Sequence, residues 1–441
     1  TFSVPYAIIY IEVKLMEYKK RIIDTELDLK LEAFGATLIV GPKGCGKTTS
    51  AKQKAKSYVE FQDEEQRENL LAVADTAPSK LLIGDKPRLF DEWQDAPKLW
   101  GAIRKSVDDL GENGLYILTG SSSKEVTTPH TGTLRISKLK MYPMSLYESE
   151  ESNGSVSLSR LFDHPENFDG CISDLSIDEL IFAICRGGWP HSLSNKTDRA
   201  KLEVAKDLYR QTYSTDISNI DNTKRNPRWA QEILRSYSRN ICTLAESNTI
   251  FGDVKSNFDI SQNTFYDYVQ ALEKLYIVED IDAWCPAIRS KTAIRSSKKR
   301  NLIDPSIAVA AMGLSPQYFN TDFKTLGFLF ESLCIRDLKI YSSAFDGDMC
   351  YYRDRYGLEA DGVLRLNDGR YALVEFKLGA KQIEEGAKHL LEIERLIDQY
   401  NQKEKQCPLR LPDLKIIITG TEFGYKRPDG VFVIPIGCLK D

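Results

Sequence analysis

Residues 41–48 have the composition and spacing of a phosphate-binding loop. They read Gly-Pro-Lys-Gly-Cys-Gly-Lys-Thr, a full match to G-x-x-x-x-G-K-[ST], between the apolar run Ala36–Val40 and a predicted helix, Thr49–Tyr58. Glycines let backbone N–H groups surround phosphate oxygens, and a helix N-terminus favours negative charge. The sequence therefore predicts ATP binding, with Lys47 reaching the β- and γ-phosphates and Thr48 acting as a ligand of Mg²⁺. The predicted nucleotide-binding residues are Gly41, Pro42, Lys43, Gly44, Cys45, Gly46, Lys47, Thr48 and Thr49.

Two acidic residues follow the apolar run Arg88–Phe90, which reads as a second strand. In this position Asp91 can complete the Mg²⁺ shell and Glu92 can orient the attacking water. The alternative is an ordinary helix N-cap after a strand. A third run, Leu115–Leu118, ends in small hydroxyl residues, and we expect Ser121 to lie beside the γ-phosphate.

Arg135 is a candidate arginine finger, which would stabilise the charge that develops during phosphoryl transfer. A surface salt bridge explains such an arginine equally well.

A second group of charged residues lies near the C-terminus, around the turn Asn367–Gly369. Counting outward from a three-residue turn places Asp361 opposite Glu375 on neighbouring strands. Like charges repel in that position, and a metal ion would remove the repulsion. Lys377 projects from the same face as Glu375, so the pattern is D…E-x-K, with two acids for Mg²⁺ and a lysine that stabilises charge or positions water. The alternative is a surface hairpin whose lysine neutralises the acids.

The elements that would position these residues belong to an α/β protein. Strands and helices alternate from 36 to 150, which is typical of a parallel sheet. From about 325 we expect a helix, two strands joined by the turn, a long amphipathic helix through 400, and strands at Lys415–Thr419 and Val431–Ile436. This is a second α/β unit.

The middle of the chain reads as helix, turn, helix and a short strand, Tyr276–Val278. Ser261 is a predicted N-cap of a helix in the recognition position of a winged helix, although winged helices also serve as packing modules. A basic connector follows, which is either a phosphate-contacting surface or a solvated linker. Its basic residues are Arg289, Lys291, Arg295, Lys298, Lys299 and Arg300.

Composition limits the function classes. The 441 residues are 42% hydrophobic and 28% charged, which is typical of a globular protein with several domains. The net charge of −5 gives no general attraction to nucleic acid, so contact with DNA requires a local patch. Nine scattered cysteines without a C-x-x-C pair indicate free thiols in a cytoplasmic protein. No apolar run is long enough for a membrane span.

Several segments together resemble the bacterial and archaeal AAA-type ATPases that carry a C-terminal domain of unknown function. The matching segments are residues 41–49, Asp91–Gln94, Leu118–Ser122, Met141–Glu148, Gly187–Pro190, Ile281–Trp284, Asp304–Ser306 and Val374–Lys377. The resemblance implies a P-loop AAA-type parallel-sheet core, a helical and winged-helix middle and a restriction-endonuclease-like α/β end. It also implies Glu331 as a further metal ligand. The chain departs from the family at Leu134, where a glycine usually precedes the arginine.

We therefore expect residues 1–15 as a possible upstream extension, an AAA-type core at 16–150, a helical lid at 151–224, a winged-helix-like domain with the basic connector at 225–300, and a nuclease-like domain at 301–441. The predicted function is ATP hydrolysis with Mg²⁺, coupled to action on DNA, and the predicted partners are DNA and further copies of the chain in a homo-oligomer. The alternative is a regulatory or signalling NTPase whose C-terminal domain is catalytically silent and binds a partner.

Overall fold

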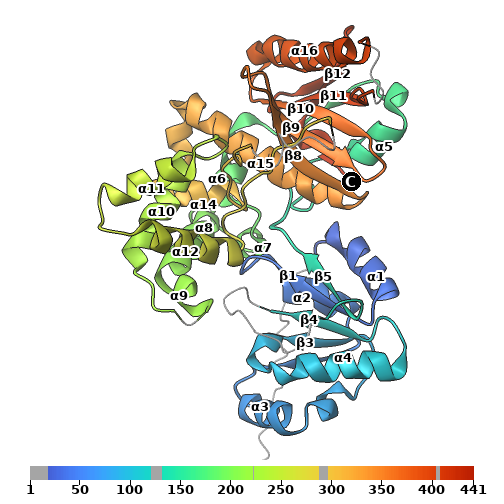
Figure 1. The fold of residues 1–441 in the computed structure, drawn as a ribbon, viewed down its shortest axis with the longest axis vertical. Coiled ribbons are helices and arrows are strands. Elements are labelled where there is room, and N and C mark those ends of the chain that lie inside the picture. The colour runs from blue at the N-terminus through green and yellow to red at the C-terminus, as the bar shows by residue number, and fades with distance from the viewer. Residues whose placement is uncertain (1–17, 121–131, 222, 288–295, 404–407) are drawn as a thin grey trace, which may run out of the picture.

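The computed structural model describes residues 18–120, 132–221, 223–287, 296–403 and 408–441. Figure 1 shows an N-terminal α/β layer, a mostly helical middle and a C-terminal α/β unit. The fold class predicted from the sequence is confirmed, because a parallel-sheet core, helices and a C-terminal sheet are all present. Among the described residues no helix is both long enough and apolar enough to cross a membrane.

The N-terminal sheet has five strands in the order β2-β3-β4-β1-β5, and every neighbouring pair is parallel. The strands are β1 (Ala36–Val40), β2 (Ser57–Glu60), β3 (Arg88–Asp91), β4 (Tyr116–Thr119) and β5 (Ile136–Lys140). The helical elements are α1 (Ile23–Ala33), α2 (Lys47–Lys54), α3 (Arg67–Thr76), η1 (Pro78–Leu82), η2 (Trp93–Asp95) and α4 (Lys98–Leu110). In the register of the sheet Thr119 lies beside both Ile39 and Asp91, so the carboxyl ends of β1, β3 and β4 meet at one edge.

The predicted helix Thr49–Tyr58 is too long. Helix α2 ends at Lys54, and Ser57 begins β2, which pairs with β3. Val59 is buried opposite Phe90, so burial of a β-branched residue in the sheet outweighs continuation of the helix.

The middle of the chain is helical (Figure 1). Its elements are α6 (Ile177–Arg186), α7 (Pro190–Leu193), α8 (Asp198–Gln211), η4 (Thr212–Asp216), α9 (Ile217–Asn219), α10 (Pro227–Arg239), α11 (Ser247–Lys255), α12 (Gln262–Lys274), α14 (Pro305–Met312) and η5 (Pro316–Asn320). Ser261 caps α12, as predicted, by accepting a hydrogen bond from the Thr264 N–H. The predicted strand at Tyr276–Val278 is reduced to an isolated antiparallel bridge between Val278 and Leu302. The winged-helix assignment stays a prediction.

The C-terminal sheet has seven strands in the order β7-β12-β13-β11-β10-β9-β8. They are β7 (Cys171–Ile172), β8 (Gly347–Arg353), β9 (Glu359–Leu366), β10 (Tyr371–Lys377), β11 (Leu414–Thr419), β12 (Phe423–Lys426) and β13 (Phe432–Pro435). Apolar side chains alternate along β10, so that Val374 packs in the cluster with α15 (Phe323–Ser343) and Leu373 packs in the cluster with α16 (Ile383–Asn401). The two helices therefore cover opposite faces of the sheet.

A helical lid was predicted to begin at residue 151. The first part of that segment instead contains two short strands that pair with strands near the C-terminus. Strand β7 pairs with β12 at the edge of the C-terminal sheet, and β6 (Val156–Ser157) pairs with β14 (Leu439–Lys440). Helix α5 (Leu158–Asp163) lies beside this sheet in Figure 1. Short strands of two residues give little sequence signal, so these pairings were missed. The remaining short elements are η3 (Pro165–Asn167), η6 (Ala380–Gln382) and η7 (Ile436–Cys438).

Candidate functional site

The phosphate loop connects β1 to α2 and has the backbone that its glycines allow. Gly41, Gly44 and Gly46 have φ values of 149°, 80° and 105°, which other residues rarely adopt. A Cβ atom added at Gly41 would lie 2.2 Å from the Met141 carbonyl oxygen. At Gly44 an added Cβ would meet nothing within 4 Å, so this part of the loop faces open space. The loop therefore has the form and the room to receive phosphates.

The reactive side chains of the loop are in contact with its own backbone and with β3. The buried Lys47 ammonium donates to the carbonyl oxygens of Gly41 and Pro42, at 3.0 and 2.9 Å. The Thr48 hydroxyl donates to Asp91 Oδ1 at 2.7 Å, and the Thr119 hydroxyl donates to the same oxygen. The structure thus brings the two predicted Mg²⁺ ligands together. Thr119 was not among the predicted site residues, although it ends the third predicted strand.

Glu92 is held in an uncommon conformation. Its φ of 56° lies in the left-handed region, and its carboxylate accepts a hydrogen bond from the Gln94 side chain instead of capping η2. The ordinary N-cap interpretation of this acid is therefore wrong. Left-handed backbone at a non-glycine residue is costly and concentrates at functional sites. The predicted Ser121 lies outside the described residues.

Arg135 lies far from the phosphate loop in its own chain. It precedes β5, and Ile136 pairs with Ala36 at the amino end of the sheet, whereas the loop follows Val40 at the carboxyl end. The guanidinium instead forms a 2.7 Å ion pair with Asp108 of α4. Leu134 has a φ of 67°, which explains why the resembling family places glycine there.

Two further groups contact the loop and were not found from the sequence. The buried Arg21 donates to the Cys45 carbonyl oxygen at 2.9 Å and pairs with Glu148 at 3.0 Å. Lys43 lies 3.4 Å from Asp216 in the helical middle. No local motif marks an arginine that lies 24 residues before its loop partner. The loop is therefore in contact with the middle of the chain as well as with the sheet.

Strands β9 and β10 follow the predicted register as far as the pair Gly362 and Val374, which directly precedes the positions of Asp361 and Glu375. Lys377 Nζ lies 2.5 Å from Glu375 Oε2 and 3.2 Å from Asp361 Oδ2. The Phe376 N–H donates to the Asp361 carboxylate at 3.1 Å. The D…E-x-K residues are thus assembled around one ammonium group.

Glu331 lies in the same pocket but pairs with a second lysine, Lys299. Lys299 Nζ lies 2.7 Å from Glu331 Oε1 and 3.2 Å from Glu359, and it donates to the Asp361 carbonyl oxygen at 3.1 Å. The Lys299 side chain is only 1% exposed. For two of its residues this corrects the prediction of a connector that contacts phosphates or is solvated, because Lys299 and the buried Arg300, which pairs with Asp280, face acids inside the protein. Residues 288–295 of the connector lie outside the described residues.

Burial and neighbouring charges shift the pKa values of these acids in different directions. Burial and the nearby Asp361 charge raise the pKa of Glu375 to about 9, against the effect of Lys377. Burial raises the pKa of Glu331 to about 7, partly offset by Lys299. Burial also disfavours the Asp361 carboxylate, but Lys299, Lys377 and the Phe376 N–H together hold the pKa of Asp361 below its usual value. Near neutral pH the pair therefore retains one negative charge and one proton.

The described residues contain no group of three or more His, Cys, Asp or Glu side chains arranged to hold a metal ion. The donor set around Asp361 and Glu375 is nevertheless of the carboxylate type that Mg²⁺ takes. His389 of α16 lies 3.5 Å from Glu375. An ion at this pair would have to displace a proton or the Lys377 ammonium.

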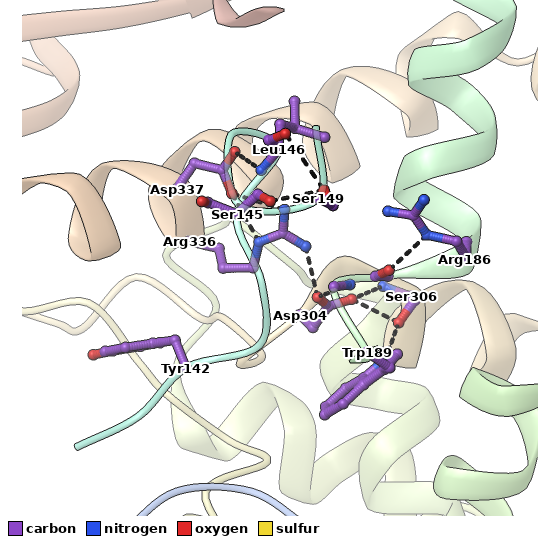
Figure 2. A network of polar contacts seen from close by, with 12 residues as sticks. Tyr142, Ser145, Leu146, Ser149, Arg186, Trp189, Asp304, Ser306, Arg336 and Asp337 are labelled. Carbon is purple, nitrogen blue, oxygen red and sulfur yellow. Dashed lines mark hydrogen bonds and ion pairs between the residues drawn. The ribbon is translucent and has the colours of Figure 1, made fainter. Parts of the chain in front are cut away.

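A buried polar network joins the end of the N-terminal sheet to the C-terminal unit (Figure 2). In α15, Arg336 donates to Asp304 at 2.7 Å and pairs with Asp337 at 2.7 Å. Asp337 in turn accepts from the Leu146 N–H at 2.9 Å, and Asp304 accepts from the Gly188 N–H at 3.0 Å. The network therefore ties the segments after β5, after α6 and before α14 to one helix.

A second contact joins the same regions. Glu279 accepts from Lys140 at the end of β5, from Tyr142 and from Lys339 of α15, at 2.6, 2.7 and 2.9 Å. Although burial opposes ionisation, the two lysines lower the pKa of Glu279 to about 2. Helix α15 thus carries Glu331 and, six to eight residues further on, the Asp337 and Lys339 side chains that contact Leu146 and Glu279.

Three family models match the chain in separate segments. An AAA domain matches residues 33–150, a domain of unknown function (DUF8612) matches residues 177–318, and another domain of unknown function (DUF4143) matches residues 326–439. The first match covers the phosphate loop and all five strands of the parallel sheet. Residues 33–150 are therefore similar to AAA domains, and the matched segment contains the whole parallel sheet and its phosphate loop. The other two descriptions name no activity, and residues 177–318 extend across both predicted boundaries of the middle region, near 225 and 300.

No curated protein matches the chain. Among solved structures, the Walker-type ATPase PABY2304 of Pyrococcus abyssi is 17% identical, with 65% of this chain and 94% of that chain covered and a TM-score of 0.38. The STAND protein PH0952 from Pyrococcus horikoshii, which has a tetratricopeptide repeat sensor, is 14% identical over 73% of this chain and 47% of that one, with a TM-score of 0.23. Drosophila ORC bound to DNA is 13% identical over 66% and 84%, with a TM-score of 0.16. Similarity at this level assigns neither fold nor function to this chain.

Proposed function

We propose that the protein binds and hydrolyses ATP with Mg²⁺ at the phosphate loop, and that this reaction controls a nuclease-like C-terminal site that acts on DNA. The observation that carries the ATPase part is the 2.7 Å contact between Thr48 and Asp91. It places a P-loop hydroxyl and a strand-end carboxylate at one point, which is the ligand pair that P-loop ATPases use for Mg²⁺.

Each residue of this site has one role. The backbone N–H groups of residues 41–49 hold the phosphates, and Lys47 turns from its two carbonyl partners to the β- and γ-phosphates. Thr48 and Asp91 hold the Mg²⁺ ion, which supplies charge neutralisation at the transferring phosphate. Glu92 orients the attacking water. Arg135 lies at the amino end of the sheet, away from the loop, and we assign it to the nucleotide site of a neighbouring copy in a homo-oligomer.

The coupling between the two sites runs through α15. Lys43 touches the helical middle, Met141 and Leu146 follow β5, and the Leu146 N–H is bound by Asp337 of α15. A shift of the phosphate loop on nucleotide binding would therefore displace α15, the helix that contains Glu331. Buried networks with fully paired charges favour discrete arrangements over gradual deformation.

At the C-terminal site we assign Asp361 and Glu375 to a divalent cation and Lys377 to stabilisation of charge on a phosphodiester. We assign Glu331 to Lys299, because that ion pair is already formed at 2.7 Å. The alternative function, a regulatory NTPase with a silent, partner-binding C-terminal domain, is favoured by a specific observation. Lysines already neutralise these acids without a metal ion.

A nicking assay on the intact protein tests the proposal. Supercoiled plasmid and single-stranded circles are incubated with Mg²⁺ or Mn²⁺, with and without ATP, with wild type, Asp361→Asn and Lys47→Ala. We expect nicking by wild type, none by Asp361→Asn, and an altered ATP dependence in Lys47→Ala. Absence of cleavage of every substrate, with ATP hydrolysis intact, would support the regulatory alternative.

A further inference from the structure

A pocket of about 970 Å³ opens at the C-terminal site, between the first turns of α15 and the segment that follows β10. Its inner wall contains Glu331, Asp361 and Lys377, whose side chains are 11%, 18% and 16% exposed. The charged groups of the site can therefore be reached from solvent, but they lie below the protein surface. A ligand has to enter the pocket to touch them.

The rim of the pocket combines aromatic and cationic side chains. Phe323, the first residue of α15, is 59% exposed, and the neighbouring Lys324 is exposed as well. Lys381 and Gln382 stand on the other side, just before α16. Across the part of the chain that the structure describes, neither Lys324 nor Lys381 has an acidic partner within ion-pair distance, whereas Lys377 and Lys299 both do.

Asp322 is the acid next to the rim residues Phe323 and Lys324 in the sequence, and it caps α15 by accepting from the Thr325 N–H at 3.0 Å and from the Thr325 hydroxyl at 2.7 Å. These hydrogen bonds turn its carboxylate toward its own helix and leave its charge in place, and among the described residues it forms no ion pair with Lys324. Two exposed ammonium groups beside an exposed aromatic ring remain at the entrance.

We propose that this pocket binds a single-stranded segment of nucleic acid, with phosphates on Lys324 and Lys381, a base stacked on Phe323, and a phosphodiester directed to Asp361 and Lys377. Aromatic platforms next to cationic grooves are the general means of holding single strands. The inference rests on the proposed function of the C-terminal site and narrows the substrate of that site to single-stranded nucleic acid.

Two features favour a single strand over a duplex. A stacked base pair has no free face for Phe323, whereas an unpaired base does. The recessed acids are also out of reach of a stiff double helix lying on the rim, because a phosphodiester has to leave the helical surface to enter the pocket. DNA and RNA share the required chemistry, and the test separates them.

Fluorescence anisotropy on the intact protein tests the inference without cleavage or nucleotide. Labelled 12-nucleotide DNA, RNA of the same sequence and the corresponding DNA duplex are titrated in EDTA across a range of salt concentrations. We expect a single strand to bind more tightly than the duplex. Phe323→Ala should weaken binding about tenfold, and Lys324→Ala and Lys381→Ala should each lower the salt slope by about 0.7.

Matched controls lie at the other end of α16. Tyr400→Ala and Lys403→Ala change an aromatic residue that is 42% exposed and an exposed lysine, about 25 Å along the helix from Gln382. Both should leave binding unchanged, and thermal melts verify that all variants are folded. Duplex binding equal to or tighter than single-strand binding, or an unaltered affinity of Phe323→Ala, would overturn the inference.

The outcomes for the two proposals are separable. Single-strand binding that depends on Phe323, without nicking in Mg²⁺ or Mn²⁺, supports the pocket assignment and removes the nuclease assignment. Nicking of duplex DNA that Phe323→Ala leaves unchanged supports the nuclease assignment and removes the pocket assignment. Failure of wild type to bind any nucleic acid removes both, and leaves ATP hydrolysis at the phosphate loop as a separate question.

Discussion

The phosphate loop and the C-terminal acid pair solve the same electrostatic problem in opposite ways. At the loop, the described contacts of the Asp91 carboxylate are with the hydroxyl groups of Thr48 and Thr119. At the C-terminal site, lysine ammonium groups contact the carboxylates directly, with Lys377 on Asp361 and Glu375. Hydroxyl donors orient a carboxylate and leave its charge in place, whereas an ammonium group neutralises it.

This difference shows which site is ready for a cation. Within the described ranges the loop has an oriented carboxylate that forms no ion pair, so a divalent ion only has to replace its hydroxyl contacts. The C-terminal pair has to give up a proton or a lysine first. Within that site the two lysines also differ, because Lys377 is 16% exposed and can move toward solvent, whereas Lys299 is 1% exposed and is fixed by the bridge between Ile281 and its own backbone.

The largest expected effect lies at the loop. Lys47→Ala removes the buried ammonium that would hold the phosphates, and we expect ATP affinity to fall by at least about a hundredfold, as for loss of a buried charged partner. A titration with a fluorescent ATP analogue measures it. Lys52→Ala, on the same helix but paired with the half-buried Glu60, is the control and should bind normally. Equal affinity of Lys47→Ala and wild type would show that the loop is not a nucleotide site.

Glu92→Gln should separate ATP binding from ATP hydrolysis at the phosphate loop. We expect ATP affinity to persist, since Asp91 and Thr48 stay in place, and phosphate release to slow by about 10²–10⁴-fold, as for loss of a general base. A coupled phosphate-release assay reports the rate. The exposed Glu65→Gln is the matched control. Hydrolysis at the wild-type rate in Glu92→Gln would move the catalytic role to another residue.

Local patterns in the sequence predicted the fold class and several of the side chains that the structure brings together. The loop motif, the strand ends and the three-residue turn fix Lys47, Asp91 and the register of Asp361 with Glu375, because each depends on a short spacing. The role of Lys299 could not be predicted in this way. It looks like one member of an exposed basic run, and only tertiary packing turns it inward onto Glu331, 32 residues away.

The same limit explains the misplaced boundary at 151. Strands β6 and β7 have two residues each, and both pair with strands more than 250 residues further along the chain. No periodicity can be read from two residues. Likewise the helix predicted to reach Tyr58 gave way to β2, whose partner β3 is fixed only in the folded sheet.

Removing Lys299 tests whether the C-terminal lysines are structural. Lys299→Met leaves Glu331 and Glu359 without their ammonium partner, and we expect a loss of about 3–5 kcal/mol in the free energy of unfolding. Chemical denaturation measures it. Lys298→Met, the neighbouring residue with a 57% exposed side chain, should change little. A second substitution, Glu331→Gln, should recover part of the loss, and no destabilisation in Lys299→Met would mean that this ion pair does not hold the domain.

The last expected effect is a pH dependence at Glu375. The pKa of this carboxyl is raised to about 9 in the folded protein, from an ordinary value of 4.5. Between these values the folded state binds a proton that the unfolded state has lost, so the free energy of unfolding should fall as pH rises from about 4.5 toward 9. Glu375→Gln keeps the shape and removes the ionisation, and it should therefore be more stable than wild type near pH 9, with a difference that vanishes near pH 4.

Thermal melts of both proteins across this range measure the difference, and Glu385→Gln, on the exposed face of α16, supplies a control without a pH-dependent change. Because Mg²⁺ would take the place of the proton between Asp361 and Glu375, excess Mg²⁺ should stabilise wild type at alkaline pH and leave Glu375→Gln less affected. If the two proteins melt alike at every pH, Glu375 is ionised throughout and Lys377 alone compensates both acids. In that case the two sites of the molecule would differ less than their contacts suggest, since both would present a carboxylate that is charged and oriented before any cation arrives.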